Sequence, residues 1–220
     1  MKRLLYGGTF DPIHIGHVHV ANRAGRLLGA ERVVLIPTGS PPHKGNRTHA
    51  GGAQRLEMVR RAVQDEPLLE VNDSEVSRPG TSYTIDTVEA LLAGPYAGDS
   101  LVVLLGQDAL EILPDWHRIE DLTQLVAFAF VPRPGAPEPD WKRLETALGP
   151  QGAASLRALR LAVPPMDVSS SDLRDRRATG RSVRCRVPDP VADFIEENDL
   201  YLEPTSPSRN EPQDDEEPSA

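Results

Sequence analysis

Cysteine is almost absent from this sequence, since Cys185 is the only one in 220 residues. One cysteine cannot form a disulfide within the chain, which is typical of a reducing compartment. Long apolar runs are also missing, and no segment approaches the roughly 20 apolar residues of a transmembrane helix. The short run that follows Lys2 and Arg3 meets Gly7 and Gly8 before it reaches the length of a signal peptide's apolar region. We therefore expect a cytoplasmic protein without a membrane partner.

The chain also lacks an excess of positive charge. Its formal net charge is −9, and residues 203–220 carry −5 of this, with six acidic side chains against Arg209. A general nucleic-acid-binding protein would show a basic stripe, so we expect no nucleic-acid partner. The same 18 residues hold four prolines and no aromatic residue. This composition predicts a disordered acidic tail at 203–220, after a single domain at 1–202.

Short apolar runs alternate with helical patterns along the first 202 residues. The runs predict strands at 3–6, 32–36, 69–71, 101–105, 124–131 and 159–163. The intervening patterns predict helices at 16–28, 53–63, 84–92, 171–179 and 190–198. Continuous apolar strands separated by helices predict an α/β fold, with a parallel sheet covered by helices on both faces. Ligands bind beyond the carboxyl ends of such strands, where the most unusual polar segments of this chain fall.

The segment GGTFDPIHIGH, at 7–17, joins the first predicted strand to the first helix. Paired glycines let backbone amides approach an anion, and a helix start adds free N–H groups and a positive dipole end. His14 and His17 are three residues apart, so both imidazoles lie on one face of the first turn and could donate to a phosphate. Two other interpretations remain open, namely a tight turn with surface histidines and a metal site formed by His14, His17 and His19.

The motif GTFDPIHIGH resembles the signature of the HxGH nucleotidyltransferases, a superfamily with a Rossmann-like fold. The segment is neither a Walker phosphate loop nor a GxGxxG dinucleotide motif. The resemblance implies that this loop contacts the phosphates of ATP through Gly8, Thr9, Phe10, His14 and His17.

A second motif, VSSSDLR, begins at Val168 and leads into a predicted helix. We expect Ser170 or Ser171 to cap the helix N-terminus. Arg174 lies where the helix dipole disfavours a cation, and a bound anion would reverse that preference. A solvated basic helix paired with its own acids is the alternative. The segment resembles the ISSTxIR motif that closes the triphosphate site in the same superfamily, which implies ATP contacts for Ser170, Ser171 and Arg174.

Two more polar segments could bind a second substrate. Lys44, in the PPHK segment at 41–44, could reach a phosphate, or it is an exposed loop lysine. Ser82, Tyr83 and Thr84 stand at a predicted helix start, where the hydroxyl and amide of Thr84 could hold a carboxylate. Ordinary helix capping explains these residues equally well.

Polar residues also end the two strongest strands. Gly106 and Asp108 follow the strand LVVLL, and a carboxylate there could accept hydrogen bonds from ribose hydroxyls. Trp116 could stack on a pyridine ring, or serve as a core or lid tryptophan. Arg133 adds a cation in the turn after the next strand.

Taken together, PPHK, SYT, GQD, the downstream tryptophan and RPG resemble the bacterial nicotinate-mononucleotide adenylyltransferases, in the same order over about residues 3–202. The acidic tail has no counterpart in that pattern. The resemblance implies transfer of AMP from ATP to nicotinate mononucleotide, which gives nicotinate adenine dinucleotide and pyrophosphate on the route to NAD. It implies that Thr84 and Trp116 handle the nicotinate ring and that Asp108 contacts ribose. The other implied contacts are Gly106 to ATP, and Lys44, Ser82, Tyr83 and Arg133 to the acceptor.

The chemistry of this transfer needs positioning more than proton transfer. A phosphate monoester is already dianionic near pH 7, so we expect direct in-line attack, with His14, His17 and Arg174 as the catalytic residues. We expect Mg²⁺ to be held mainly by the ATP phosphates and water, without metal ligands from the protein, because no carboxylate cage is apparent.

Three other functions remain alternatives. Phosphopantetheine adenylyltransferase is the nearest, although that family usually has threonine at the position of His14. A non-catalytic nucleotide-binding regulator would be expected to lose the histidines or Arg174, and this chain keeps them. A phosphate-ester hydrolase would need a metal cluster or a nucleophile with a paired base. The sequence leaves open whether the protein is a monomer or a homo-oligomer, and whether it prefers nicotinate or nicotinamide.

Overall fold

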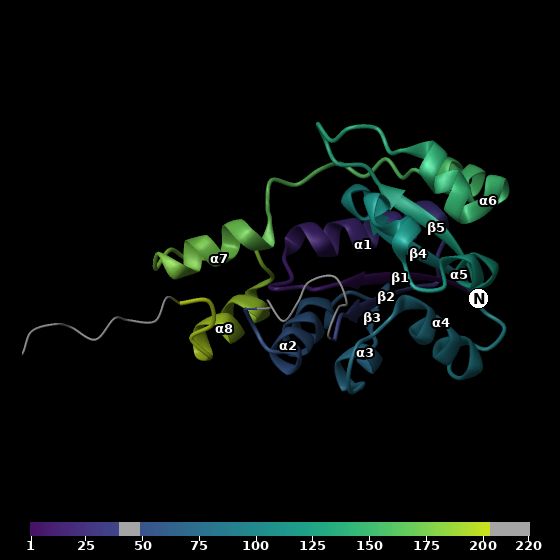
Figure 1. Ribbon diagram of the computed structural model, residues 1–220. Helices are drawn as coiled ribbons and strands as arrows, with labels where there is room; N and C mark the ends of the chain where they lie inside the picture. The colour runs from purple at the N-terminus through teal and green to yellow at the C-terminus, as the bar shows by residue number, and fades with distance from the viewer. Residues whose placement is uncertain (40–48, 203–220) are drawn as a thin grey trace, which may run out of the picture.

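A computed structural model describes residues 1–39 and 49–202 of the chain. Its sheet has five parallel strands in the order β3-β2-β1-β4-β5 (Figure 1). The strands are β1 Lys2–Gly8, β2 Arg32–Pro37, β3 Leu69–Val71, β4 Ser100–Gly106 and β5 Val126–Val131. The predicted α/β fold, with a Rossmann-like parallel sheet, is confirmed.

The helices cover both faces of this sheet. They are α1 Ile15–Leu28, α2 Gly52–Val63, α3 Ser74–Ser77, α4 Thr84–Ala93, α5 Ile119–Leu125, α6 Trp141–Ala158, α7 Ser170–Ala178 and α8 Asp189–Glu197, with short 3₁₀ turns η1 Gln107–Glu111 and η2 Leu113–Asp115. One apolar core joins the sheet to α1, α2, α7 and α8, and a second joins the other face to α4, α5 and α6. None of the helices in the described residues is both long enough and apolar enough to span a membrane.

The central strands have apolar side chains on both faces because both faces are buried. In β2, Val33 and Leu35 pack in the first core, whereas Val34 and Ile36 pack in the second. The same alternation runs through β4, where all five residues of Leu101–Leu105 are buried. Continuous apolar runs are therefore the correct signal for these strands.

The segment at 159–163 is not a strand of the sheet, so that prediction is wrong. Arg160 forms only an isolated bridge with Phe130, through hydrogen bonds from Phe130 N to Leu159 O (3.1 Å) and from Leu161 N to Phe130 O (2.8 Å). The next step would need an N–H group on Pro132, which proline lacks, and Val163 N bonds to Leu161 O instead, so the pairing ends after one step.

Three helices were not predicted, namely α3, α5 and α6. The strand predicted at 124–131 begins only at Val126, because Gln124 and Leu125 complete α5. The pattern of the long helix α6 is broken by Gly149, which has a non-helical backbone (φ 70°, ψ 166°), and by Pro150 directly after it. A Gly-Pro pair reads as a loop signal, although tertiary packing here joins two helical segments across the kink.

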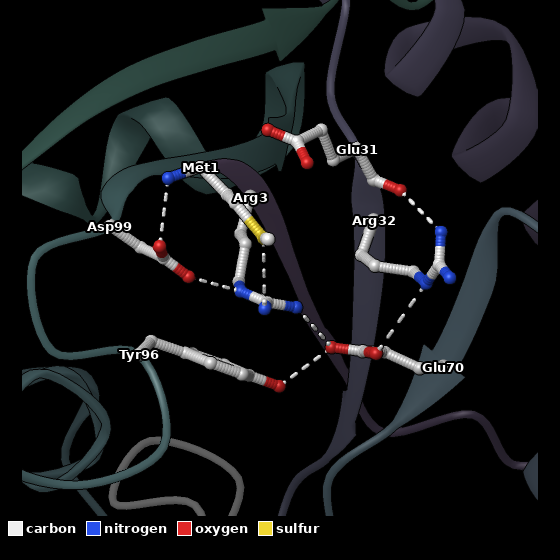
Figure 2. Close-up of polar contacts among 7 residues, drawn as sticks. All are labelled: Met1, Arg3, Glu31, Arg32, Glu70, Tyr96 and Asp99. Atoms are coloured by element: carbon white, nitrogen blue, oxygen red, sulfur yellow. Dashed lines mark hydrogen bonds and ion pairs between the residues drawn. The ribbon is translucent and has the colours of Figure 1, made fainter.

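A polar cluster lies where β1 begins, beside β3 and the turn before β4 (Figure 2). The ammonium group of Met1 donates to Asp99 Oδ1 at 2.8 Å, and the guanidinium of Arg3 bonds to both Asp99 and Glu70. Tyr96 donates its hydroxyl to Glu70 at 2.7 Å, and Arg3 lies over its ring, 4.1 Å from the centroid. The cluster therefore links β1, β3 and the turn before β4.

Replacing Asp99 with Asn should lower the midpoint of thermal unfolding at pH 7. The hydrogen bonds from the N-terminal ammonium and from Arg3 hold the pKa of Asp99 below its ordinary value. A lowered pKa means that the ionised carboxylate stabilises the fold above about pH 4, and that this contribution is lost as the pH falls through the folded-state pKa. The difference between wild type and Asp99→Asn should therefore be constant from pH 5 to 7 and shrink below about pH 4. The exposed Glu145 of α6 offers a control, Glu145→Gln, and equal midpoints for wild type and Asp99→Asn at pH 7 would contradict the assignment.

Candidate active site

A cavity of about 270 Å³ opens at the carboxyl ends of β1, β2 and β4. The cavity is lined by the loops that follow these parallel strands, by the start of α4 and by the residues on either side of η2. Seven of the predicted site residues line it, namely Gly8, Thr9, Ser82, Tyr83, Thr84, Gly106 and Trp116. Residues from four separate segments of the chain therefore meet where the fold class places a ligand.

Aromatic rings form one side of the cavity. Trp116 packs edge-on against Phe128 of β5, with ring centroids 6.5 Å apart, and its partly buried side chain lines the cavity. The ring of His117 lies 4.4 Å from the ring of Tyr83, tilted by 37°, and it also lines the cavity. His117 was not predicted as a site residue. Its position directly after Trp116 was the only signal in the sequence.

The residues that were expected to cap the start of α4 do not cap it. Tyr83 is the N-cap, and no side-chain hydrogen bond satisfies the first-turn amides from that position. Ser82 instead donates its hydroxyl to the backbone oxygen of Glu75 at 3.4 Å. The capping interpretation of Ser82 and Thr84 is therefore not supported. The positive end of α4 and its amides remain at the cavity wall, where they favour an anion.

Glu75 is a buried carboxylate that the sequence did not single out. It lines the cavity, and its Oε1 accepts a hydrogen bond from Thr87 Oγ1 at 3.0 Å. Burial raises the pKa of Glu75, which its hydrogen bonds from Thr87 and from the N–H of Gly39 oppose. A Cβ atom at Gly39 would lie 2.1 Å from the Glu75 backbone oxygen. Only glycine permits this close approach of the loop after β2 to α3.

His14 and His17 cap the start of α1 reciprocally. His14 is the N-cap, and its Nδ1 accepts from His17 N at 3.3 Å, while His17 Nδ1 accepts from His14 N at 3.3 Å. The two rings stack with centroids 3.7 Å apart. Because each Nδ1 is an acceptor, the neutral form of each ring carries its proton on Nε2. Each histidine therefore keeps one N–H donor that the helix cap does not use.

The environment of the pair favours neutral imidazoles. Burial lowers the pKa of His14 to about 4, and burial followed by the nearby charge of His14 lowers the pKa of His17. The ring of His19 is bound elsewhere, with Nε2 at 3.1 Å from Pro164 O. Within residues 1–39 and 49–202, no group of three or more His, Cys, Asp and Glu side chains could hold a metal ion. The metal-site interpretation of the three histidines is thus not supported in the described part of the chain.

Both histidines should remain neutral across the working range of pH. We expect the ring C–H resonances of His14 and His17 to show no protonation step between pH 5.5 and 8 in the free protein, and their Nδ1 to carry no proton. Since the folded-state pKa values are lowered, the unfolded chain binds more protons below about pH 6.5, and stability should fall as the pH drops from there towards 4. Histidine ¹H–¹⁵N correlation spectra test this directly. A step near pH 6.5 for both rings would contradict the capping arrangement.

The helix α7 lies against the loop that follows β1 (Figure 1). Ser170 donates its hydroxyl to Pro12 O at 2.9 Å, and Arg174 donates to Asp11 O at 2.8 Å and to Ser171 Oγ at 3.3 Å. These contacts bring the predicted motif beside the histidine loop, from which it is separated by more than 150 residues in sequence. The helix cap is Ser169, whose side chain accepts from Asp172 N, rather than Ser170 or Ser171 as predicted.

Eight predicted site residues within the described part of the chain do not line the cavity. Five of them gather at the loop after β1, namely His14, His17, Ser170, Ser171 and Arg174. The other three are Asp108, Arg133 and Phe10. Asp108 and Arg133 form an exposed ion pair, 2.8 Å between Oδ2 and NH1, and neither lines the cavity. Phe10 is buried in the first core, and its ring packs edge-on against His17 with centroids 5.1 Å apart. Lys44, with the rest of the PPHK segment, lies outside the described residues.

Comparisons with known proteins agree with this geometry. The cytidylyltransferase-like family matches residues 5–176. A protein of Herpetosiphon aurantiacus named "Probable nicotinate-nucleotide adenylyltransferase" is 42% identical over 205 residues, which cover 92% of this chain and 100% of that protein. A protein of the same name from Symbiobacterium thermophilum is also 42% identical, over 89% of this chain and 93% of that protein. The chain belongs to the nicotinate-nucleotide adenylyltransferases of the cytidylyltransferase-like family.

Solved structures show the same fold. Plasmodium falciparum nicotinic acid mononucleotide adenylyltransferase complexed with NaAD superposes with a TM-score of 0.72 at 18% identity, over 91% of this chain and 97% of that one. The same protein complexed with APC gives a TM-score of 0.69 at 18% identity, over 91% and 96% of the two chains. At this identity, the likeness shows that the fold is shared.

Proposed function

We propose that the protein transfers AMP from ATP to nicotinate mononucleotide, giving nicotinate adenine dinucleotide and pyrophosphate. The observation that carries this proposal is the cavity, in which an aromatic wall and a free helix N-terminus lie beside the loop of His14 and His17. Membership of the nicotinate-nucleotide adenylyltransferase family supports the same reaction.

The acceptor's pyridine ring fits the side of the cavity formed by Trp116. An indole ring offers a flat apolar face to a heteroaromatic ring, and a negatively charged ring substituent is favoured at the start of α4. The first-turn amides and the hydroxyl of Thr84 are donors, which match a carboxylate better than an amide group that brings donors of its own. We therefore propose a preference for nicotinate over nicotinamide.

ATP fits the loop between β1 and α1, with its phosphates beside His14 and His17. The two Nε2–H groups and the loop amides act as hydrogen-bond donors to the triphosphate. Arg174 adds a positive charge, although two of its guanidinium nitrogens already bind Asp11 O and Ser171. Ser170 acts mainly on the loop, because its one hydroxyl proton is donated to Pro12 O. We propose that Asp108 meets the ribose at the end of β4 after release from its exposed pair with Arg133.

The reaction itself is a displacement at the α-phosphorus of ATP. A phosphate oxygen of the acceptor forms the new P–O bond, and the bond to pyrophosphate breaks, so that pyrophosphate leaves with the electron pair. No general base is needed, because the attacking phosphate is already ionised at pH 7. The protein contributes alignment and stabilisation of the developing negative charge by donors held in place before the reaction.

We propose that magnesium enters the site bound to the phosphates of ATP. The described residues offer no cluster of three or more acidic, cysteine or histidine ligands, so they fit an ion held by phosphate oxygens and water. Such an ion would offset the charge of the triphosphate and of the leaving pyrophosphate. The cytoplasmic location and the acidic tail stay predictions from composition.

The acceptor preference tests the proposed function. With ATP and Mg²⁺, pyrophosphate release should be fast with nicotinate mononucleotide, slower with nicotinamide mononucleotide and absent with phosphopantetheine. Turnover with phosphopantetheine alone would replace the proposed substrate. Silence with all three acceptors, in protein that binds ATP, would support the non-catalytic regulator.

Removing the Nε2–H of His17 should lower kcat by at least about 100-fold, the scale of losing one donor to a transition-state anion. His17→Asn is the sharpest variant, because its side-chain oxygen can still accept from His14 N while it lacks the distal donor. His17→Ala, which also removes the cap, should lose stability as well. Steady-state kinetics with both substrates, together with thermal unfolding, separate these effects. A change in KM alone would remove His17 from the transition state.

A further inference from the structure

Arg55 of α2 is a buried cation without a carboxylate in its hydrogen-bonding shell. Its side chain is only 1% exposed, and it is the largest fully buried side chain of the described residues. The guanidinium donates from Nη1 to Thr9 O at 2.7 Å, and from Nη2 to Thr38 O at 2.7 Å and Gly39 O at 3.4 Å. Burial lowers the pKa of Arg55, and the nearby charge of Asp11 opposes that shift. Burying a charge costs free energy. A cost of this kind calls for a role that an apolar side chain could not fill.

The three acceptors of Arg55 belong to the two loops that enter the cavity. Thr9 follows β1, and Thr38 and Gly39 follow the neighbouring strand β2. Gly8, Thr9 and Thr38 all line the cavity. One rigid guanidinium therefore fixes the distance between the two loops, since its fork reaches both at once.

The hydrogen bonds of Arg55 also set which polar groups the loops present. A trans peptide directs its C=O and its N–H to opposite sides, so a carbonyl held by Arg55 sends the next N–H away from it. The peptide between Thr38 and Gly39 fits this rule, because the Gly39 N–H acts on the Glu75 carboxylate and lowers its pKa, while the carbonyl of Thr38 is held by Arg55. A phosphate is repelled by carbonyl oxygens and attracted by N–H groups, so turning carbonyls towards the interior favours its binding.

Two other side chains also donate hydrogen bonds to backbone oxygens of the loop after β1. Arg174 holds Asp11 O at 2.8 Å, and Ser170 holds Pro12 O at 2.9 Å. The Asp11 side chain accepts from His49 N (2.7 Å), from Ala50 N (3.1 Å) and from the hydroxyl of Tyr201 (2.8 Å). The loop after β1 is thus held by side chains of both α2 and α7. Among these residues, only Arg55 also binds the loop after β2.

We propose that Arg55 is a positioning residue for adenylyl transfer. It aligns the loops after β1 and β2 so that the ATP phosphates and the acceptor phosphate meet in line, and its buried charge favours anions above it. The inference rests on the proposed function only in that phosphates bind at these loops. Arg55 itself touches no substrate, because its hydrogen bonds are directed to backbone oxygens and its side chain is closed from solvent.

Arg55→Lys tests the positioning role, because lysine keeps the charge and loses the fork that reaches both loops. The variant should fold, and its kcat should fall about 10- to 100-fold, the scale of a small misalignment of reacting groups. Arg60→Lys is the matched control on the same helix. Arg60 is half exposed and pairs with Asp73 at 2.9 Å, so its variant should keep wild-type kcat and KM. Thermal unfolding of each variant shows whether lost activity reflects unfolded protein.

A comparison of Arg55→Gln with Arg55→Lys separates the effect of the charge from the effect of loop alignment, because both variants lose the fork and only lysine keeps the charge. Glutamine removes the charge and leaves one amide group that can reach a single carbonyl. Titration with a non-hydrolysable ATP analogue should give a larger Kd for Arg55→Gln than for Arg55→Lys, and for both a larger Kd than for wild type. This measurement needs no acceptor, so it still tests Arg55 if nicotinate mononucleotide proves to be the wrong substrate. Folded Arg55→Lys with kcat, KM and analogue Kd within twofold of wild type would overturn the proposal, as would equal losses in Arg60→Lys.

Discussion

The direction of a few backbone carbonyl groups is the constraint on which the proposed site depends. A loop that receives a triphosphate must offer N–H donors and hide oxygen acceptors, and it must do so without the lysine of a Walker loop. In this protein the oxygens of Thr9, Asp11 and Pro12 are bound by Arg55, Arg174 and Ser170. The donors come from two helices that are distant in sequence, and the packing of α2 and α7 on the sheet therefore serves the chemistry of the loop.

In the histidine pair, each ring also has two roles. Capping a helix with two imidazoles uses the acceptor nitrogen of each ring and leaves the donor nitrogen. Serine would be an ordinary cap, but its single hydroxyl would not leave a donor at the reach of an imidazole Nε2. Burial lowers the pKa of both rings, and the nearby charge of His14 lowers that of His17 further, so each ring is a neutral donor instead of a cation.

The sequence predicted most of what local chemistry determines. Apolar runs located all five strands, and the glycines and histidines of the first loop marked the segment that we propose binds phosphate. What it could not predict depends on contacts between distant segments. Nothing in the sequence singled out Arg55 or Glu75, and Ser170 was expected to cap a helix or to contact ATP. Their burial and partners are set by tertiary packing. The false strand at 159–163 and the missed α6 show the converse, in which a local signal was overruled by the surrounding structure.

The dependence of the first loop on α7 has a consequence for the order in which the protein can form. The loop at residues 9–14 leaves the ribosome early, whereas Ser170 and Arg174 emerge more than 150 residues later. Until then the sheet can pair and α1 can begin, but two of the carbonyls of the loop have no partner. Contacts of such long sequence separation form late and slow the folding of the whole domain. Because Leu173 of α7 and Val191 of α8 also belong to the first core, a nascent chain of this protein completes that core and the loop after β1 only when its last helices have been made.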